Sequence, residues 1–146
     1  MKILIDADAC PVTKIIIKIA KEYNIKVVMF ADNTHILSDD YAKIIIVDKG
    51  ADSVDLALIG YVNKGDIVIS QDYGVAAMAL AKKSYALNQN GLIFTDDNID
   101  LLLFQRHDSK KIIRSGKRLK SIKKRTIEND IKFEDTFKKL IQKILN

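Results

Sequence analysis

The chain has 146 residues, of which 48% are hydrophobic and 29% are charged, and its formal net charge is +5. This length and composition are typical of a soluble protein that folds as one domain, and we assign residues 1–146 to it. A single cysteine excludes an internal disulfide. The first residues lack the basic flank and apolar stretch of a secretory signal, and no apolar run is long enough to span a bilayer. We therefore expect a cytoplasmic protein without membrane contact.

The first apolar run ends in two aspartates. Residues 2–5 are expected to form a buried strand, which Asp6 and Asp8 follow. Extended residues at i and i+2 point to the same side, so the two carboxylates are expected to lie together. Pro11 suits the first position of a helix, and the apolar residues after it recur with helical spacing up to Tyr23.

The rest of the chain alternates between apolar runs and helical patterns. Short apolar runs predict strands at residues 26–31, 43–47 and 66–70, and one further strand at 85–87 or at 92–94. Helical patterns predict helices at residues 53–63, 74–84, 98–113 and 130–145, the last docked on the sheet. This alternation indicates an α/β fold, a three-layer sandwich in which helices cover both faces of a mostly parallel sheet.

Aspartates follow several of the expected strands. Because the carboxyl ends of parallel strands open on one edge, Asp6, Asp8 and Asp72 are expected at the same edge. We expect Asp55 and Asp97 to reach that edge as well, because helix N-termini face it. One aspartate after a strand is more often a helix cap, but several converging carboxylates repel unless a cation compensates them. Because carboxylate oxygens suit Mg²⁺ or Mn²⁺, the pattern predicts a divalent metal site.

A basic segment precedes the last helix. Nine of the 24 lysines and arginines lie in residues 110–125, which contain no acid, whereas the other residues carry 15 basic and 19 acidic groups. Such a block displaces counterions from phosphates, so it predicts contact with a nucleic acid, although a solvated helix end has the same composition. The residues expected to make this contact are Lys117, Arg118, Lys120, Lys123, Lys124 and Arg125.

Three functions fit an acidic edge beside a basic segment. In the first, Asp6, Asp55 and Asp72, with Asp8 or Asp97, hold Mg²⁺ or Mn²⁺ ions that promote hydrolysis of a phosphodiester in a nucleic acid. In the second, the apolar strand followed by Asp-x-Asp resembles the haloacid-dehalogenase phosphatases, which implies Asp6 as nucleophile and Asp8 as general acid. The chain is short for such a phosphatase with its cap. In the third, the chain binds nucleic acid without catalysis.

Several longer strings resemble one bacterial family. They are residues 6–12 (DADACPV), 31–35 (ADNTH), 50–55 (GADSVD), 65–82 (GDIVISQDYGVAAMALAK) and Arg106-His107. These strings closely resemble the YaiI/YqxD family of bacterial proteins, and the resemblance runs nearly from end to end. It implies a PIN-like fold, which is the fold of metal-dependent ribonucleases, and it makes RNA the expected substrate.

The PIN pattern implies roles for three aspartates. It has an acid after the first strand, one on a middle helix and one at the helix after the fourth strand, and Asp6, Asp55 and Asp72 match these places. Many PIN nucleases have Glu at the middle position, so Asp52 is an alternative to Asp55. Many relatives have a Gly-Pro pair before the basic Lys-Arg-Thr motif, where this chain has Ser121-Ile122.

Further residues near the strand ends are candidates for lesser roles. Four polar residues are candidates for orienting the substrate: Asn33, His35, Gln71 and Thr126. The fourth acidic ligand stays open among Asp8, Asp96 and Asp97. Neighbouring carboxylates should raise the pKa of the Cys10 thiol, which favours a packing role over a nucleophilic one. The sequence leaves the oligomeric state open.

Overall fold

The computed structural model describes residues 1–34, 38–50, 52–114 and 124–146, with the backbone alone for residue 9 and residues 106–114. The described residues form one six-stranded sheet of strand order β3-β2-β1-β4-β5-β6. Its strands are β1 (Lys2–Asp6), β2 (Lys26–Asp32), β3 (Lys43–Val47), β4 (Ile67–Ile69), β5 (Tyr85–Leu87) and β6 (Ile93–Phe94). Strands β1 to β5 are parallel, and β6 is antiparallel to β5.

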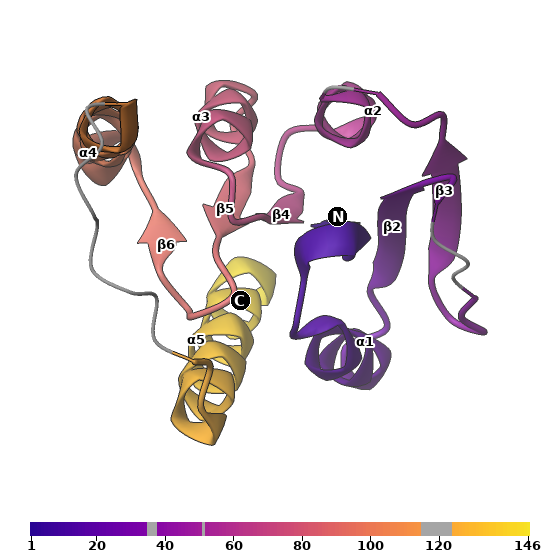
Figure 1. Cartoon of the computed structure of the whole chain (residues 1–146). Helices are drawn as coiled ribbons and strands as arrows, with labels where there is room; N and C mark the ends of the chain where they lie inside the picture. Colours follow the sequence, from indigo (N-terminus) through magenta and orange to yellow (C-terminus); the bar gives the residue numbers. More distant parts are fainter. Residues whose placement is uncertain (35–37, 51, 115–123) are drawn as a thin grey trace.

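Helices cover both faces of this sheet, as Figure 1 shows. The helices are η1 (Ala7–Ala9, a 3-10 helix), α1 (Thr13–Glu22), α2 (Ser53–Tyr61), α3 (Tyr73–Ala81), α4 (Asp96–Arg114) and α5 (Ile127–Leu145). Helices α1 and α5 lie on one face, and α2, α3 and α4 lie on the other. The predicted α/β three-layer architecture is therefore confirmed. None of the helices described is long and apolar enough to cross a membrane.

Residue alternation in β1 divides the core into two layers. Ile3 and Ile5 pack with α1 and α5, whereas Leu4 packs with α2 and α3, and all three side chains are fully buried. Side chains of a strand alternate between its faces, so a continuous apolar run is what a strand covered on both sides requires. This explains why β1 has no polar residue before Asp6.

Helix α5 docks through the apolar stripe that the sequence predicts. Phe133, Phe137, Leu140 and Ile141 are buried against the layer that contains α1. The rings of Phe133 and Phe137 stack with their centroids 5.4 Å apart. Burying one such aromatic side chain contributes about 1.5–3 kcal/mol, so this stripe accounts for the docking.

The order of the strands creates a crevice beside β1. The chain runs from β1 outward through β2 and β3 and then returns to β4 on the other side of β1. In open α/β sheets, ligands bind outside the carboxyl ends of the strands where the order reverses in this way. Ile5 pairs with Ile69, so Asp6 and Ser70 end neighbouring strands at this point.

A buried ion pair fixes β1 beside β4 at the opposite, amino edge. The Lys2 ammonium lies 2.6 Å from Asp66 Oδ2, and the side chain of Asp66 is 4% exposed. The same carboxylate accepts hydrogen bonds from the backbone N–H groups of Lys2 (3.1 Å) and Asn63 (2.8 Å). A buried carboxylate needs such partners, and together they hold the register that sets the position of Asp6.

Some element boundaries differ from the prediction. Helix α1 begins at Thr13 rather than at Pro11, because the η1 turn lies between β1 and the helix. Both candidate strands form, as the antiparallel pair β5 and β6. Helix α4 begins at Asp96 rather than at Asn98, because the Asn98 and Thr95 side chains accept hydrogen bonds from each other's backbone N–H groups and cap the helix.

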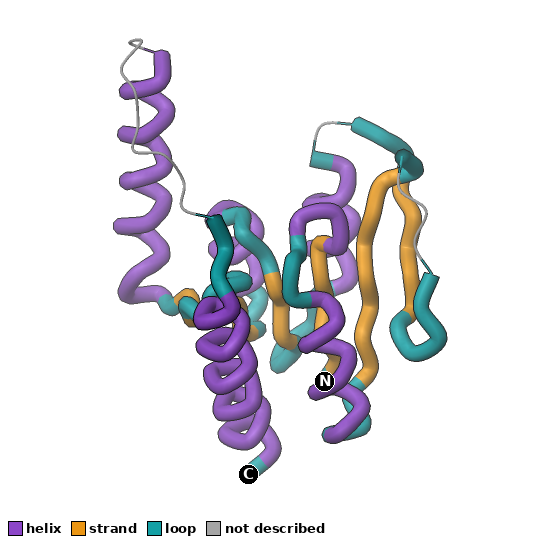
Figure 2. The backbone as a smooth tube through the Cα atoms, turned by 60° about the horizontal axis from the view of Figure 1, so that its bottom comes forward, coloured by secondary structure: helices purple, strands orange, loops and turns teal. Residues whose placement is uncertain are grey.

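The antiparallel direction of β6 corrects one expectation about the acidic edge. Because β6 returns toward the amino edge of the sheet, Asp96 and Asp97 at the start of α4 lie at the edge opposite Asp6. Figure 2 shows α4 as the helix that runs into the grey trace, standing beside the sheet and extending past it. The expectation that Asp97 joins the other aspartates was wrong, because it treated the strand before Asp96 as parallel to its neighbour.

Candidate functional site

Asp6 ends β1 and is the centre of the candidate site. Its Oδ1 atom is buried and has no hydrogen-bond partner among the described residues. The pKa of Asp6 is raised from 3.8 to about 6, first because the carboxyl is buried and then because Asp55 and Asp8 carry negative charge nearby. The charge of Asp72 raises this pKa further. A buried acceptor without a partner costs free energy, so a positively charged or hydrogen-bond-donating group beside Asp6 Oδ1 would be favourable.

Three different elements bring the surrounding carboxylates to Asp6. Asp55 lies in the first turn of α2, Asp8 in η1, and Asp72 at the N-cap of α3. The cap is made by Asp72 Oδ1, which accepts from the N–H of Val75 at 3.1 Å, while the N–H of Asp72 donates to Ser70 Oγ at 3.0 Å. The effect of all three charges on Asp6 agrees with their predicted convergence on one edge.

Asp8 reaches the site by a route that the sequence did not indicate. It lies in a 3-10 turn and not in an extended strand, because the chain turns immediately after β1. Its Oδ2 atom accepts a hydrogen bond of 3.1 Å from the N–H of Asp32 at the end of β2. The N–H of Asp8 in turn lowers the pKa of Asp6. Asp8 therefore joins the ends of β1 and β2 in addition to adding charge.

Asp32 is an acid at the same edge that the sequence analysis missed as a site residue. Its Oδ1 accepts a hydrogen bond from the N–H of Thr34 at 2.9 Å and another from the Thr34 hydroxyl. These bonds form the tight turn that places the exposed side chain of Asn33 at the end of β2. The available signal was an aspartate directly after an apolar strand, the same signal that identified Asp6.

A small cavity separates Asp6 from a second buried oxygen. Its volume is about 10 Å³, and it is lined by Asp6, Cys10, Ile69, Ser70, Gln71 and Gln89. Gln89 Oε1 is also buried without a hydrogen-bond partner in the described part of the chain. Room for about one water, lined by two such acceptors, fits a single small cation or donor.

Gln89 is the second functional candidate that sequence reasoning missed. It lies in the loop between β5 and β6, where Asn88 Oδ1 accepts hydrogen bonds from the N–H groups of Asn90 and Leu92, both at 2.9 Å. The signal was a polar turn at the carboxyl end of a parallel strand. Gln89 was missed because the sequence analysis treated residues 85–87 and 92–94 as alternative strands. The structure has both strands, and they form a hairpin with this turn between them.

Arg125 holds this loop in place. Its guanidinium donates 2.7 Å hydrogen bonds to the Gln89 carbonyl and to Asn90 Oδ1, and Nε donates at 2.8 Å to Asp130 Oδ1. Its side chain is 24% exposed. Arg125, expected to contact nucleic acid, thus has a structural task in which all three guanidinium nitrogens take part. Lys124 beside it is exposed.

The remaining predicted residues are placed as follows. Asp52 is exposed, occupies the N-cap position of α2 in a left-handed conformation (φ 61°) and makes no side-chain cap hydrogen bond. Thr126 precedes α5, where Asn129 Oδ1 accepts hydrogen bonds from its N–H at 2.9 Å and its hydroxyl at 3.2 Å. Gln71 lines the cavity beside Asp6. Five predicted residues lie outside the described ones: His35, Lys117, Arg118, Lys120 and Lys123.

The predicted pKa direction for Cys10 agrees with the structure. Burial is the largest cause that raises the pKa of its thiol, and the negative charge of Asp6 adds to it. The Thr13 side chain and the charge of Arg125 act in the opposite direction. The carboxylates named by the sequence analysis are therefore a secondary cause, and a protonated Cys10 packs against the wall of the cavity.

The residues present fit one divalent cation with few protein ligands. Within residues 1–34, 38–50, 52–114 and 124–146, no three or more His, Cys, Asp or Glu side chains are grouped closely enough to hold a metal ion. Mg²⁺ usually keeps several waters and binds proteins through only one or two carboxylates. The buried, unpartnered Oδ1 of Asp6 is the observation that suits such an ion, with the neighbouring aspartates supplying charge.

Comparisons with known proteins agree with the resemblance of the motifs. A family model described as "Uncharacterized BCR, YaiI/YqxD family" matches residues 4–143. A UPF0178 protein of Alkaliphilus oremlandii is 59% identical over 92% of this chain and 86% of its own length. A UPF0178 protein of Lachnoclostridium phytofermentans is 52% identical over 99% of both chains. No solved structure matches the chain significantly. Both the family model and these relatives cover nearly the whole sequence, and the chain belongs to the YaiI/YqxD family.

Proposed function

We propose that this protein is a divalent-metal-dependent nuclease that hydrolyses phosphodiester bonds in RNA, with Asp6 at its centre. The observation that carries the proposal is the buried Oδ1 of Asp6, which has no partner among the described residues and is surrounded by the charges of Asp55, Asp8 and Asp72. A bound Mg²⁺ or Mn²⁺ ion would supply the Lewis acidity that phosphodiester hydrolysis requires.

The chain's own residues have separate tasks in this proposal. Asp6 would hold the cation, because its ionised form gains most from a neighbouring positive charge. Asp55 and Asp72 would raise the negative potential at the crevice, and the N-cap bonds of Asp72 keep its carboxylate in a fixed position. Gln71 and Gln89 would orient a water or a phosphate oxygen beside Asp6, since both line the same cavity.

The basic segment supports a polyanionic substrate. Residues 110–125 give the chain its positive net charge, whereas the rest has more acids than bases. An acidic site repels phosphates, so a nuclease needs cations nearby to bring the substrate in. Lys124, which is exposed at the end of this segment, is the contact that the described residues favour. The RNA preference comes from the resemblance to PIN-like nucleases.

The structure supplies an argument against the phosphatase alternative. That mechanism needs Asp8 as a proton donor to the leaving group. In the structure, Asp8 Oδ2 is instead engaged with the N–H of Asp32 and joins the ends of β1 and β2. The alternative of a nucleic-acid-binding module without catalysis is separated from the nuclease by experiment.

The test combines metal binding with cleavage. Thermal unfolding of the wild type should shift upward with millimolar Mn²⁺ or Mg²⁺, and Asp6→Asn should abolish the shift. Asp40→Asn, an exposed acid outside the site, is the matched control and should keep it. Cleavage of a labelled single-stranded RNA should need the same ion and the same carboxylate. A metal-induced shift without cleavage supports the binding module, and an unchanged melting temperature overturns the metal site.

A further inference from the structure

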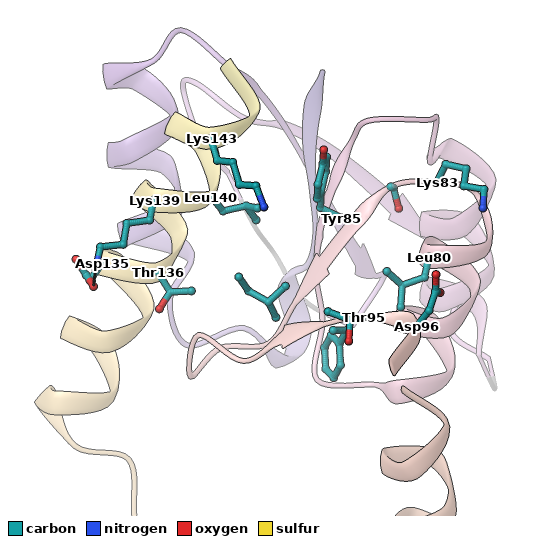
Figure 3. Close-up of a pocket in the computed structure, with 13 residues that line it drawn as sticks. Leu80, Lys83, Tyr85, Thr95, Asp96, Asp135, Thr136, Lys139, Leu140 and Lys143 are labelled. Atoms are coloured by element: carbon teal, nitrogen blue, oxygen red, sulfur yellow. Dashed lines mark ion pairs between the residues drawn. The ribbon is translucent and has the colours of Figure 1, made fainter. Parts of the chain in front are cut away.

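A second and larger pocket lies at the amino edge of the sheet, away from Asp6. It is bounded by α5 on one side and by the end of α3 and the start of α4 on the other, as Figure 3 shows. The volume of this pocket is about 640 Å³. Sites for small organic ligands enclose roughly 300–1,000 Å³, so the space suits such a molecule.

The floor of this pocket is apolar and only partly covered. Leu87 belongs to the core layer of α5 and is fully buried. Tyr85, two residues earlier on the same strand, and Ile93, which pairs with Leu87, face the same side. They remain 38% and 36% exposed, because α5 does not reach over the edge of the sheet at this point. Their uncovered surfaces offer a flat apolar platform.

One stripe of α5 forms the wall of the pocket. Thr136, Leu140 and Lys143 recur at helical spacing and all line it. Lys143 extends from α5 toward Tyr85 in Figure 3. Gly91, in the loop before β6, approaches this wall so closely that a Cβ atom there would lie 3.1 Å from Thr136 Oγ1 and 3.2 Å from the Lys132 carbonyl. The wall and the loop are therefore packed against each other.

The charges around the pocket favour an anion. Of its two acids, Asp135 pairs with Lys139 at 3.0 Å, and Asp96 lies in the first turn of α4, where the helix dipole stabilises negative charge. Lys83 and Lys143 make no ion pair with any described residue. Three lysines and two aspartates therefore line the pocket, and the excess positive charge is that of Lys143 on the α5 side.

Lys83 also has an unusual backbone. Its φ of +64° is left-handed, at a position after α3 where glycine is the usual residue. This conformation is strained for a residue with a Cβ atom. The side chain of Lys83 lies at the rim of the pocket.

We propose that this pocket binds a small amphipathic anion. The flat apolar part of the ligand would lie on Tyr85, Ile93 and Leu140, and its carboxylate, sulfonate or phosphate group would bind the ammonium group of Lys143. The proposal is independent of the nuclease, because the two sites lie at opposite edges of the sheet.

The test uses two probes with nearly the same apolar body. Anilinonaphthalenesulfonate is an aromatic anion that fluoresces when it leaves water, and phenylnaphthylamine lacks its sulfonate. The wild type should bind the sulfonate with one-to-one stoichiometry and about tenfold more tightly than the amine, as one charge-assisted hydrogen bond provides. Lys143→Gln should remove this preference, and Tyr85→Ala should weaken both probes. Displacement by naphthoate and by naphthyl phosphate then shows which anionic group is preferred.

Lys132→Gln is the matched control, because Lys132 is exposed on the same helix and does not line the pocket. It should leave both affinities unchanged. Lys143 is exposed, so its replacement is expected to leave the fold intact. The proposal is overturned if the two probes bind equally well to the wild type, or if Lys143→Gln and Tyr85→Ala bind the sulfonate as the wild type does.

Discussion

Arg125 donates a 2.7 Å hydrogen bond to the backbone carbonyl of Gln89, 36 residues earlier in the chain. The side chain of Gln89 lines the same cavity as Asp6, so this bond connects the end of the basic segment to the candidate site. Asn90 Oδ1 receives another bond from the same guanidinium, which fixes the loop at two neighbouring residues. An arginine that sequence reasoning assigned to nucleic acid therefore also shapes the site that would act on it.

Replacement of Arg125 is expected to destabilise the protein even when the positive charge is kept. Arg125→Lys retains the charge but cannot reproduce the planar fork that reaches Gln89, Asn90 and Asp130. We expect a loss of about 1–3 kcal/mol in the free energy of unfolding, as measured by denaturant titration. Hydrogen exchange should also speed up at the amides of Asn90 and Leu92, whose bonds to Asn88 depend on the shape of the loop.

Lys124→Gln is the control for this experiment, because Lys124 is exposed and is the neighbour of Arg125 in the chain. It should change stability by less than about 0.5 kcal/mol. Equal stabilities for Arg125→Lys, Lys124→Gln and the wild type would show that the three hydrogen bonds do not anchor the loop.

Asp6→Asn is expected to stabilise the metal-free protein in neutral solution. The pKa of Asp6 is 3.8 in a model peptide and about 6 in the folded protein, so the unfolded chain loses its proton first as the pH rises. Stability therefore falls between these two values, and the whole penalty is present above the folded pKa. The shift corresponds to at most about 3 kcal/mol, and we expect about 1–2 kcal/mol because water screens a half-buried carboxylate.

The measurement is thermal unfolding as a function of pH in the presence of a chelator. Asp6→Asn should melt above the wild type at about pH 7.5, and the two curves should meet below about pH 3, where Asp6 is protonated in both the folded and the unfolded protein. Asp40→Asn should follow the wild type throughout, since this acid is exposed. A wild type that is more stable than Asp6→Asn at neutral pH, without metal, would contradict the raised pKa.

The sequence was sufficient for the parts of the site that depend on local patterns. An apolar run followed by Asp6 identifies the end of a strand. Asp72 was expected at the start of the helix after the fourth strand, and there its Oδ1 accepts a hydrogen bond from the N–H of Val75. Parallel pairing of β1 with β4 then brings these two strand ends together. Strand periodicity and α/β connection rules contain this information.

The remaining features depend on contacts that periodicity does not encode. Strand β6 has two residues, too few for a pattern, and its direction depends on a loop that Arg125 holds from far along the chain. Because the prediction gave this strand the wrong direction, it placed Asp97 at the wrong edge of the sheet. Asp8 was expected in extended backbone after the first strand, whereas the turn into α1 begins directly after Asp6 and gives Asp8 its bond to Asp32.

Asp8 offers a way to separate structure from charge. Asp8→Asn keeps an oxygen that can accept the hydrogen bond from the N–H of Asp32 and removes the negative charge, whereas Asp8→Ala removes both. We expect Asp8→Asn to fold with stability near that of the wild type and to lower the pKa of Asp6, because one of the charges that raise it is gone. Asp8→Ala should lose about 0.5–1.5 kcal/mol, because the N–H of Asp32 then exchanges this bond for one to water.

Carbon-detected NMR titration of the Asp6 carboxyl and denaturant unfolding measure these two effects. Asp100→Asn is the control, because Asp100 is exposed on α4 and does not act on Asp6. If Asp8→Asn and Asp8→Ala lose the same stability, the bond to Asp32 has no structural value. If the pKa of Asp6 stays at the wild-type value in Asp8→Asn, the charge of Asp8 does not reach it.

RNA binding is expected to depend on the lysines at the end of the basic segment and not on total charge. Neutralising Lys120, Lys123 and Lys124 to Gln removes three cations but leaves Arg125 and its loop in place. Each phosphate contact with a single strand contributes about 0.7 to the slope of log affinity against log salt, so the slope should fall by about 2. Fluorescence anisotropy of a labelled single-stranded RNA, at several salt concentrations and with a chelator, measures this slope without cleavage.

The control removes the same charge from the other edge of the molecule. Lys26 and Lys43 begin β2 and β3, and Lys64 precedes β4, so all three are exposed at the amino edge, opposite Asp6. Their triple replacement by Gln should lower affinity only through the weak, screened effect of net charge, with a slope close to that of the wild type. Equal slopes for the two triple variants would show that the basic segment does not bind the RNA backbone. A loss of slope confined to the first triple variant would show that Lys120, Lys123 and Lys124 contact the RNA backbone.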